Sequence, residues 1–220
     1  MAKNYLILYK YIYGANNKSP DIKLCKKLYD MGYRTRGDLL QHIKLKKAPK
    51  LSNSLRIQIK YNIKKNIKNA EALNVIKSLK LVLKKYKMIP VGSIRREEKM
   101  HSDIDILLIA PSNFIIKDTN LNFVEGQSRH QKYIFTLNKK NYLIDVFICN
   151  KKELPYMLFH YTGSKQYNIR TRAYVKKKGL LLNQYGLWKN NKLVYLNIKS
   201  EKELIRKIGI SYRKPTNRQK

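Results

Sequence analysis

Residues 88–110 read MIPVGSIRREEKMHSDIDILLIA, in which a Gly-Ser pair follows one short apolar run and a D-I-D triplet opens another. Side chains at positions i and i+2 of a strand project from the same face, so Asp103 and Asp105 are expected to stand side by side. A third acid, Asp145, lies within the apolar run YLIDVFIC of residues 142–149. Adjacent carboxylates repel one another, and neither apolar run contains a basic residue, so divalent cations are their natural partners.

The residues just upstream of the acids favour a site for a phosphorylated substrate. Gly92 allows backbone N–H groups to approach a phosphate, and the Ser93 hydroxyl adds a donor. Arg95 and Arg96 can offer paired N–H groups to phosphate oxygens. An isolated D-x-D pattern is common and would more simply be a turn residue followed by a solvated one. The phosphate donors and the acids together instead predict a two-metal phosphoryl-transfer site, with the three acids as metal ligands and catalytic residues.

The whole chain is strongly basic. It has 48 Lys and Arg against 14 Asp and Glu, which gives a formal net charge of +34 over 220 residues. Such a field attracts polyanions, and nucleic acid is the first partner to consider. A genome rich in A and T would also favour the many Lys, Asn, Ile and Tyr residues, so the charge is discounted for that bias. An anionic membrane surface is a weaker alternative, because no single segment gathers its basic residues opposite a clean apolar face.

The cysteine and apolar patterns indicate an intracellular protein. Cys25 and Cys149 lie in apolar surroundings without metal-ligand spacing, so two reduced thiols are expected. No stretch approaches the roughly 20 apolar residues of a membrane span. The opening YLILY, residues 5–9, lacks the small-residue cleavage site of a signal peptide and is interpreted as part of a first helix.

The hydrophobic period changes along the chain and predicts an α+β fold in three parts. Residues 1–87 have helical spacing, residues 88–151 read as a mixed sheet with at least one helix, and residues 152–220 read as a small α+β module. Helices are expected over 21–31, from Thr35 through Ile43 with a break at Ala48-Pro49, from Ser52 or Ser54 through Ile67, and over 70–87, 154–159, 164–178 and 201–208. Extended segments are expected over 88–91, 103–110, 133–137, 142–149, 180–182 and 193–195. The end of the chain from Pro215 onward is expected to fray.

These motifs resemble those of the family X DNA polymerases, within the polymerase-β nucleotidyltransferase superfamily. Residues 92–96 (GSIRR) with the D-I-D triplet resemble the palm signature of that family, and residues 160–164 (HYTGS) resemble its Y-F-T-G-S turn. Small viral members share G-S-x-R-R-E-E-K-M and L-N-Q-Y-G-L. The match continues through Asn168, Arg172-Ala173, residues 182–187 (LNQYGL), residues 200–203 (SEKE) and residues 212–215 (YRKP). The resemblance covers residues 88–215 well.

Upstream, the helical part resembles the DNA-binding subdomain of the family. Gly32, Arg34-Thr35 and Asp38-Leu39 are similar to the second half of its helix-hairpin-helix, and residues 51–61 to the segment that follows. The hairpin glycines are replaced by Ser19-Pro20-Asp21, which puts a backbone-carbonyl cation site in doubt. The chain is also too short upstream for the lyase domain of the family, so no deoxyribose-phosphate lyase activity is expected.

The resemblance implies roles for individual residues. Asp103 and Asp105 would bridge two Mg²⁺ ions, with Mn²⁺ as the alternative, and Asp145 would hold the catalytic ion and orient the primer 3′-hydroxyl. The implied nucleotide-binding residues, drawn from the palm and the nucleotide-binding subdomain, are Ser93, Arg96, Ser102, His160, Tyr161, Gly163, Asn168 and Arg172. The implied DNA-binding residues are Lys60, Lys64 and Arg172, the last of which would reach the templating base.

Three positions depart from the family pattern. Ser102 replaces a glycine, and His160 stands where many members have a tyrosine. Leu143 stands two residues before Asp145, where an arginine near the primer terminus is usual. Primer alignment or fidelity is therefore expected to differ. Taken singly, an aromatic such as Tyr161 would more simply be a core residue, so the assignment depends on the joint spacing of the motifs.

The implied activity is that of a template-directed DNA polymerase that fills short gaps in repair of the base-excision type. A template-independent or RNA-directed nucleotidyltransferase remains an alternative, because the palm motif is common to all of these enzymes. A non-catalytic DNA-binding protein is a further one. The expected partners are gapped or nicked DNA, deoxynucleoside triphosphates and a DNA ligase, with the chain acting as a monomer away from membranes. The expected location is a cytoplasmic replication site or the virion for a viral protein, and the nucleus otherwise.

Overall fold

The computed structural model describes residues 8, 22–44, 51–64, 66–112 and 114–218, and these fall into two compact units. The first unit comprises Met1–Asn66 with Thr136–Tyr142, and the second comprises Ile67–Phe135 with Leu143–Lys220. The predicted first helix around residues 5–9, the Ser19-Pro20-Asp21 segment and the predicted break at Ala48-Pro49 lie outside the described residues, apart from Leu8. Among the described helices, none is long and apolar enough to cross a membrane.

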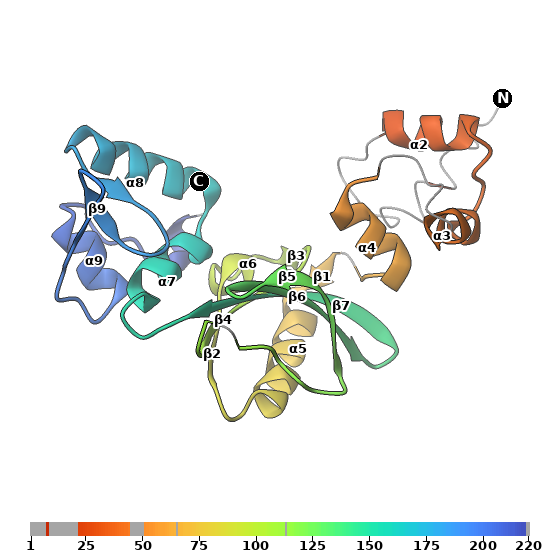
Figure 1. Cartoon of the computed structure of the whole chain (residues 1–220), viewed down its shortest axis with the longest axis horizontal. Helices are drawn as coiled ribbons and strands as arrows, with labels where there is room; N and C mark the ends of the chain where they lie inside the picture. The colour runs from red at the N-terminus through yellow and green to blue at the C-terminus, as the bar shows by residue number, and fades with distance from the viewer. Residues whose placement is uncertain (1–7, 9–21, 45–50, 65, 113, 219–220) are drawn as a thin grey trace. The chain divides into compact units, whose positions relative to one another are not determined.

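In the described part of the first unit, three short helices pack around one apolar core (Figure 1). They are α2 (Ile22–Asp30), α3 (Arg36–Lys44) and α4 (Asn53–Tyr61), each of which matches a predicted helix. As predicted, Thr35 caps α3, because its hydroxyl accepts the Asp38 N–H at 3.2 Å while Asp38 accepts the Thr35 N–H at 2.8 Å. The core residues are Leu8, Cys25, Leu28, Tyr33, Leu39, Leu51, Leu55 and Ile59.

The third predicted helix begins where expected but ends earlier. Ser52 caps it by accepting the Leu55 N–H at 3.3 Å. The extension through Ile67 is wrong, because Asn62 adopts a left-handed conformation with φ of 50° and closes the helix after Tyr61. Beyond that point the chain runs beside the 136–142 hairpin, where Lys64 N donates to the Asn141 carbonyl at 2.8 Å. Helical spacing of isoleucines was therefore a weaker determinant than the asparagine cap.

A five-stranded mixed sheet with the order β2-β4-β7-β6-β5 is the centre of the second unit (Figure 1). Its central pair, β4 and β7, is parallel and buried, which explains why both segments read as near-continuous apolar runs. The β5 strand was not predicted, because its few apolar residues are interrupted by Asn, Glu and Gly and do not alternate regularly. The strands are β2 (Lys87–Pro90), β4 (Ile104–Ile109), β5 (Leu121–Gln127), β6 (His130–Leu137) and β7 (Lys140–Cys149).

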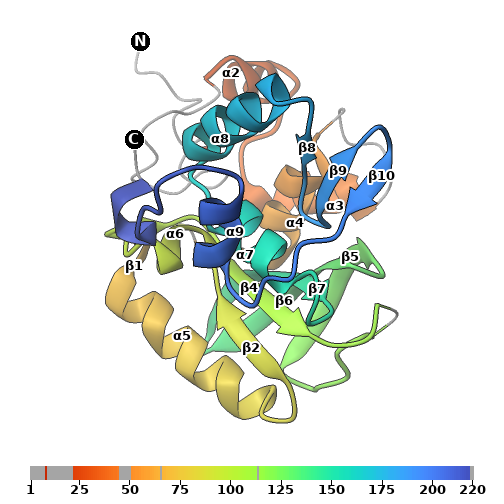
Figure 2. The same cartoon turned by 90° about the vertical axis from the view of Figure 1, so that its left-hand side faces the viewer.

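Helix α5 (Asn69–Val82) lies along one face of this sheet, as both views show (Figure 1 and Figure 2). Its buried side is formed by Ala72, Val75, Ile76 and Leu79. The contacts place α5 with the sheet, in the compact unit that begins at Ile67. The division into parts 1–87, 88–151 and 152–220 stays a prediction.

Two short strands before and after α5 form a separate ladder. They are β1 (Ile67–Lys68) and β3 (Met100–His101), which pair antiparallel with Ile67 opposite His101. The short helix α6 (Gly92–Arg95) lies between β2 and β3 in the sequence. This ladder brings the start of α5 close to the segment that carries the Gly-Ser pair.

The C-terminal part of the second unit is a small α+β layer, as predicted from its mixture of helical and extended segments. Its core includes Tyr156, Phe159, Tyr167 and Leu204. The helices are α7 (Leu154–Thr162), α8 (Lys165–Lys177), α9 (Glu201–Lys207) and the 3₁₀ turn η1 (Pro215–Arg218). The strands, in the order β10-β9-β8, are β8 (Leu181–Leu182), β9 (Leu187–Lys189) and β10 (Lys192–Val194).

The predicted fraying from Pro215 onward is wrong for residues 215–218. Arg218 is fully buried, and its Nη1 donates to Glu201 Oε1 at 2.5 Å while its Nε donates to the Arg213 carbonyl at 2.9 Å. The second oxygen of Glu201 accepts Arg95 Nη2 at 2.8 Å. A basic sequence near the chain end is therefore ordered here because one buried carboxylate compensates two guanidinium groups.

Candidate active site

Two of the three predicted acids lie on the adjacent parallel strands β4 and β7, and the third lies just before β4. Asp105 and Asp145 are direct partners in the register of the parallel pair β4 and β7, and Asp103 immediately precedes β4. Asp145 is 8% exposed, and Ser102 Oγ donates to Asp103 Oδ1 at 2.9 Å. The alternation of the strand therefore places Asp103 and Asp105 on one face, as the sequence predicted.

The environment of Asp105 disfavours its ionised form. Burial raises the pKa of this carboxyl to about 8, and the charges of Asp103 and Asp145 act in the same direction, whereas Arg96 opposes them. Gly92 makes the close approach possible: it has φ of +62°, and a Cβ atom there would lie 2.0 Å from Asp105 Oδ2. The glycine that we singled out as a phosphate neighbour is therefore also required by the carboxylate itself.

The donor set fits hard divalent cations. Within the described ranges, no three His, Cys, Asp or Glu side chains converge closely enough to form a ready metal site. Carboxylate oxygens are nevertheless the ligands that Mg²⁺ and Mn²⁺ prefer. Burial is the main cause of the raised pKa of Asp105, and a nearby cation would relieve the repulsion that Asp103 and Asp145 add to it.

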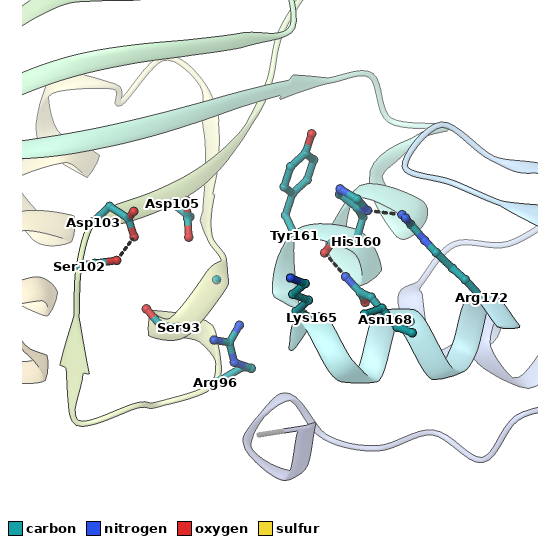
Figure 3. A pocket seen from close by; sticks show the side chains of 13 residues that line it. Ser93, Arg96, Ser102, Asp103, Asp105, His160, Tyr161, Lys165, Asn168 and Arg172 are labelled. Carbon is teal, nitrogen blue, oxygen red and sulfur yellow. Dashed lines mark hydrogen bonds between the residues drawn. The ribbon is translucent and has the colours of Figure 1, made fainter. Parts of the chain in front are cut away.

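A pocket of about 460 Å³ lies beside these acids. Its two walls face each other, with the acids and α6 on one side and the end of α7 and the start of α8 on the other (Figure 3). All eight predicted nucleotide-binding residues line it, together with Asp103 and Asp105. Its lining residues are Gly92, Ser93, Arg96, Ser102, Asp103, Asp105, His160, Tyr161, Gly163, Lys165, Asn168, Ile169 and Arg172.

The arginine on the first wall is already engaged. Arg96 Nε donates to Glu98 Oε1 at 2.8 Å, and its Nη1 donates to the Thr162 carbonyl. Gly163, with φ of +70°, allows this contact, since a Cβ atom there would lie 3.0 Å from Arg96 Nη1. Arg96 thus connects α6 to the end of α7 while its guanidinium lines the pocket.

On the second wall, three predicted residues are linked to one another. Asn168 Nδ2 donates to the His160 carbonyl at 2.7 Å, and an Arg172 guanidinium nitrogen donates to His160 Nδ1. Burial, with the charge of Arg172 acting in the same direction, lowers the pKa of His160 to about 4, so the ring is neutral and can accept this bond. Asn168 Oδ1 and Arg172 Nε are buried without a hydrogen-bond partner, which leaves two polar atoms for a ligand to satisfy.

Sequence reasoning missed residues that only tertiary contacts bring to the site. Lys165 lines the pocket, and His130 on β6 lies with Nε2 at 2.7 Å from Asp145 Oδ1. The His130 ring stacks on Phe147 with centroids 4.6 Å apart, and Phe147 stacks on Tyr161 at 3.7 Å. Neither Lys165 nor His130 belongs to a motif. A period-2 pattern on β6 was the only signal that could have placed His130 on the face of Asp145.

The predicted DNA-binding lysines lie elsewhere. Lys60 is exposed at the end of α4, with Nζ 5.0 Å from the Tyr61 ring centroid, and Lys64 is half-buried after that helix. Both belong to the first unit, and Arg172 belongs to the second. Leu143, the expected departure on the primer side, is 6% exposed and packs within the sheet.

The fold and the carboxylate pocket define a nucleotidyltransferase, and comparisons with known proteins agree. Residues 70–169 match the family described as "Nucleotidyltransferase domain", and residues 157–219 match "DNA polymerase beta thumb". The chain is 43% identical over 140 residues to "Repair DNA polymerase X" of African swine fever virus, which covers 60% of this chain and 80% of that protein. The chain therefore belongs to the family X DNA polymerases, and the resemblance found in the sequence is confirmed.

Other relatives extend the likeness beyond the palm and the thumb. A "DNA nucleotidylexotransferase" of Xenopus laevis is 24% identical over 256 residues, which covers 90% of this chain and 49% of that protein. The solved structure of Leishmania infantum polymerase beta in a ternary gap complex matches 99% of this chain and 91% of that one, with a TM-score of 0.71 and 20% identity. This structural likeness supports the α+β fold class over nearly the whole chain.

Proposed function

We propose that this chain fills short gaps in DNA during repair of the base-excision type by templated addition of deoxynucleotides. The observation that carries the proposal is the single pocket in which two acids face the residues expected to contact a nucleotide. The name of the viral relatives, which are repair DNA polymerases, points the same way. The net charge of +34 suits a DNA substrate.

In this proposal the acids hold two Mg²⁺ ions, with Mn²⁺ as the alternative. Asp103 and Asp105 would contribute oxygens to both ions, and Asp145 to the one beside the primer. When bound, such cations neutralise phosphate charge and favour loss of the proton from the primer 3′-hydroxyl. Asp145 would in addition orient that hydroxyl, since it is the acid of the neighbouring strand in direct register with Asp105.

The remaining pocket residues would bind and orient the nucleotide. Ser93, Arg96 and the backbone of Ser102 would contact the triphosphate, while Tyr161 and Gly163 would line the sugar. The second wall would contact the bases, through Asn168 for the incoming nucleotide and Arg172 for the template. The orphaned Asn168 Oδ1 and Arg172 Nε favour this role, because burial without a partner is costly in the absence of a ligand.

Lys60 and Lys64 would hold the DNA through its phosphates, in addition to the contact of Arg172 with the template base. Phosphate contacts of this kind fix the position of a duplex without reading its sequence. A DNA ligase would be the natural consumer of the product, because filling a gap leaves a nick. We also propose that the chain acts as a monomer inside the cell, at the site of viral replication or in the virion if it is a viral protein, and in the nucleus otherwise.

A template-independent activity is the second candidate. It is favoured by the likeness to the nucleotidylexotransferase, whose alignment extends over 90% of this chain. The two candidates differ in whether the second wall must contact a template base. Single-stranded DNA and a duplex with a one-nucleotide gap therefore separate them.

The test is primer extension on both substrates, with each deoxynucleoside triphosphate supplied singly. Templated gap filling predicts that the complementary nucleotide is added to gapped DNA and that single-stranded DNA is extended little. Asp145→Ala should abolish addition while DNA affinity stays near that of the unaltered chain. Asp30→Ala, at an exposed carboxylate of α2, is the matched control and should keep full activity. Addition by the Asp145 variant, or indifference to the template, would overturn the proposal.

A further inference from the structure

The Ser93 hydroxyl is hydrogen-bonded to a buried histidine. Ser93 Oγ lies 2.8 Å from His101 Nδ1, and His101 Nε2 lies 3.1 Å from Asn69 Oδ1. The imidazole is 3% exposed, whereas Ser93 lines the pocket and Asn69 is half-buried. One ring thus uses both of its nitrogen atoms to connect the start of α5 to the pocket wall.

Local structure fixes the ring in this place. The β1–β3 ladder sets His101 opposite Ile67, and α5 begins at Asn69, two residues after Ile67. Asn69 N donates to the Lys99 carbonyl at 3.2 Å, so the backbone at the start of α5 is tied to the segment just before β3. The orientation of the ring is therefore set by backbone contacts that do not involve a substrate.

The two contacts of the ring define the hydrogen-bonding roles of its nitrogen atoms. A neutral imidazole has one donor and one acceptor. Because Asn69 Oδ1 accepts from Nε2, the remaining Nδ1 accepts the hydroxyl hydrogen of Ser93.

A histidine backed by an asparagine suits a hydroxyl that must contact an anion. In the other neutral tautomer, Nδ1–H donates to Ser93 Oγ, and the serine hydrogen is then available to a phosphate oxygen. An amide carries both an acceptor and a donor, so Asn69 can pair with either tautomer. In this exchange the Asn69 amide turns over so that its Nδ2 donates to His101 Nε2, and the net charge of the three side chains does not change.

We propose that His101, oriented by Asn69, is a positioning residue that holds the Ser93 hydroxyl against the triphosphate of the incoming nucleotide. This inference rests on the proposed function, in which Ser93 contacts that triphosphate. His101 itself lies behind the pocket wall and does not line the pocket. Its effect on the nucleotide is therefore expected to pass entirely through Ser93.

The test is a double-mutant cycle read out by nucleotide binding. The affinity for dATP is measured by calorimetry with Ca²⁺ in place of Mg²⁺, for the unaltered chain, Ser93→Ala, His101→Leu and the double variant. Each single change should weaken dATP binding about tenfold, the size of one hydrogen bond to a charged group, and the double change should weaken it no further. His101→Asn should recover part of the loss, because its amide can pair with the Ser93 hydroxyl.

A matched control lies in the first unit. His42 Nδ1 lies 2.9 Å from the Tyr33 hydroxyl, so His42→Leu removes a similar histidine–hydroxyl bond away from the pocket and should leave dATP affinity unchanged. Asn69→Ala provides a second route if His101→Leu does not fold. It should weaken dATP binding about threefold, and this effect should vanish in the Ser93→Ala background.

Additive losses in the cycle would overturn the inference, because His101 would then act other than through Ser93. Unchanged affinity in both single variants would overturn it as well. The proposed function fails separately, if the unaltered chain binds dATP but adds no nucleotide to gapped DNA. In gap-filling assays, the same variants should raise the KM for dATP in the same non-additive way, with kcat changed much less.

Discussion

His130 Nε2 lies 2.7 Å from Asp145 Oδ1, and the His130 side chain is 48% exposed. One oxygen of the acid nearest to the proposed primer hydroxyl is thus held by a neighbouring strand, which leaves the other oxygen for a cation. Phe147 supports the same ring from one side by stacking. The contact orients Asp145 without neutralising it by a lysine or an arginine.

His130→Phe should slow nucleotide addition. The variant keeps an aromatic ring against Phe147 but removes the hydrogen bond that orients Asp145. We expect kcat to fall about tenfold, the typical scale for loss of one orienting hydrogen bond, with the KM for dATP little changed. His130→Gln should recover much of the loss, because its amide nitrogen can replace Nε2. Single-turnover gap filling measures both, and an unchanged rate for His130→Phe would remove the orienting role.

Asp105→Asn should stabilise the cation-free protein, and more so at high pH. The folded pKa of Asp105 is about 8, well above its ordinary value of 3.8. Between these two values the folded chain retains a proton that the unfolded chain has lost, so stability falls as the pH rises from about 4 to about 8. The asparagine removes this loss. The melting temperature at pH 5 and pH 8.5 without divalent cations, with Asp30→Asn as control, should show a gain of several degrees at the higher pH. An equal gain at both pH values would contradict the shifted pKa.

Gly92→Ala should damage the site more than its backbone strain explains. The added Cβ atom would lie 2.0 Å from Asp105 Oδ2, so the carboxylate must move. Gly179 provides the matched control, since its φ of +72° is similar and nothing lies within 4 Å of a Cβ atom there. We expect Gly179→Ala to cost about 1 kcal/mol of stability with normal activity, and Gly92→Ala to lose activity at least 100-fold. Equal activities of the two folded variants would show that the close approach is unimportant.

DNA affinity should fall steeply with salt, because the chain carries a net charge of +34. Each phosphate contact contributes about 0.9 to the slope of log affinity against log salt concentration. Lys60→Ala should reduce that slope by about 1, and Lys64→Ala by a similar amount. Lys192→Ala, at an exposed position on β10, should leave it unchanged. Fluorescence anisotropy of a labelled gapped duplex gives these slopes, and a flat response would count against DNA as the substrate.

The pocket was predictable to the extent that its residues belong to local motifs. Asp103 and Asp105 share a face because of strand alternation, whereas the direct register of Asp105 with Asp145 is known only from the parallel pairing of β4 and β7. His130 and Lys165 were not predictable, because they reach the site through strand pairing and helix placement. The backing of Ser93 by His101 was also hidden, since it depends on the two-residue strands β1 and β3.

The fold shows the same limit at its less regular points. The early end of α4 was missed because the asparagine cap at Asn62 outweighed the helical spacing of Ile63 and Ile67. The ordered end of the chain was missed because composition alone marks residues after Pro215 as basic and polar. Long buried runs such as β4 and β7 were read correctly, since their apolar content leaves little choice.

The sharing of Glu201 by Arg95 and Arg218 has a practical consequence for anyone who produces this protein. Arg218 is fully buried and pairs with Glu201. The same carboxylate also pairs with Arg95, the last residue of the short helix that carries Ser93. An affinity tag fused directly after η1 could displace Arg218 and leave the buried carboxylate of Glu201 with less compensation. Purification handles belong at the other end of the chain, and a preparation with a C-terminal fusion should be compared with an untagged one before its kinetics are interpreted.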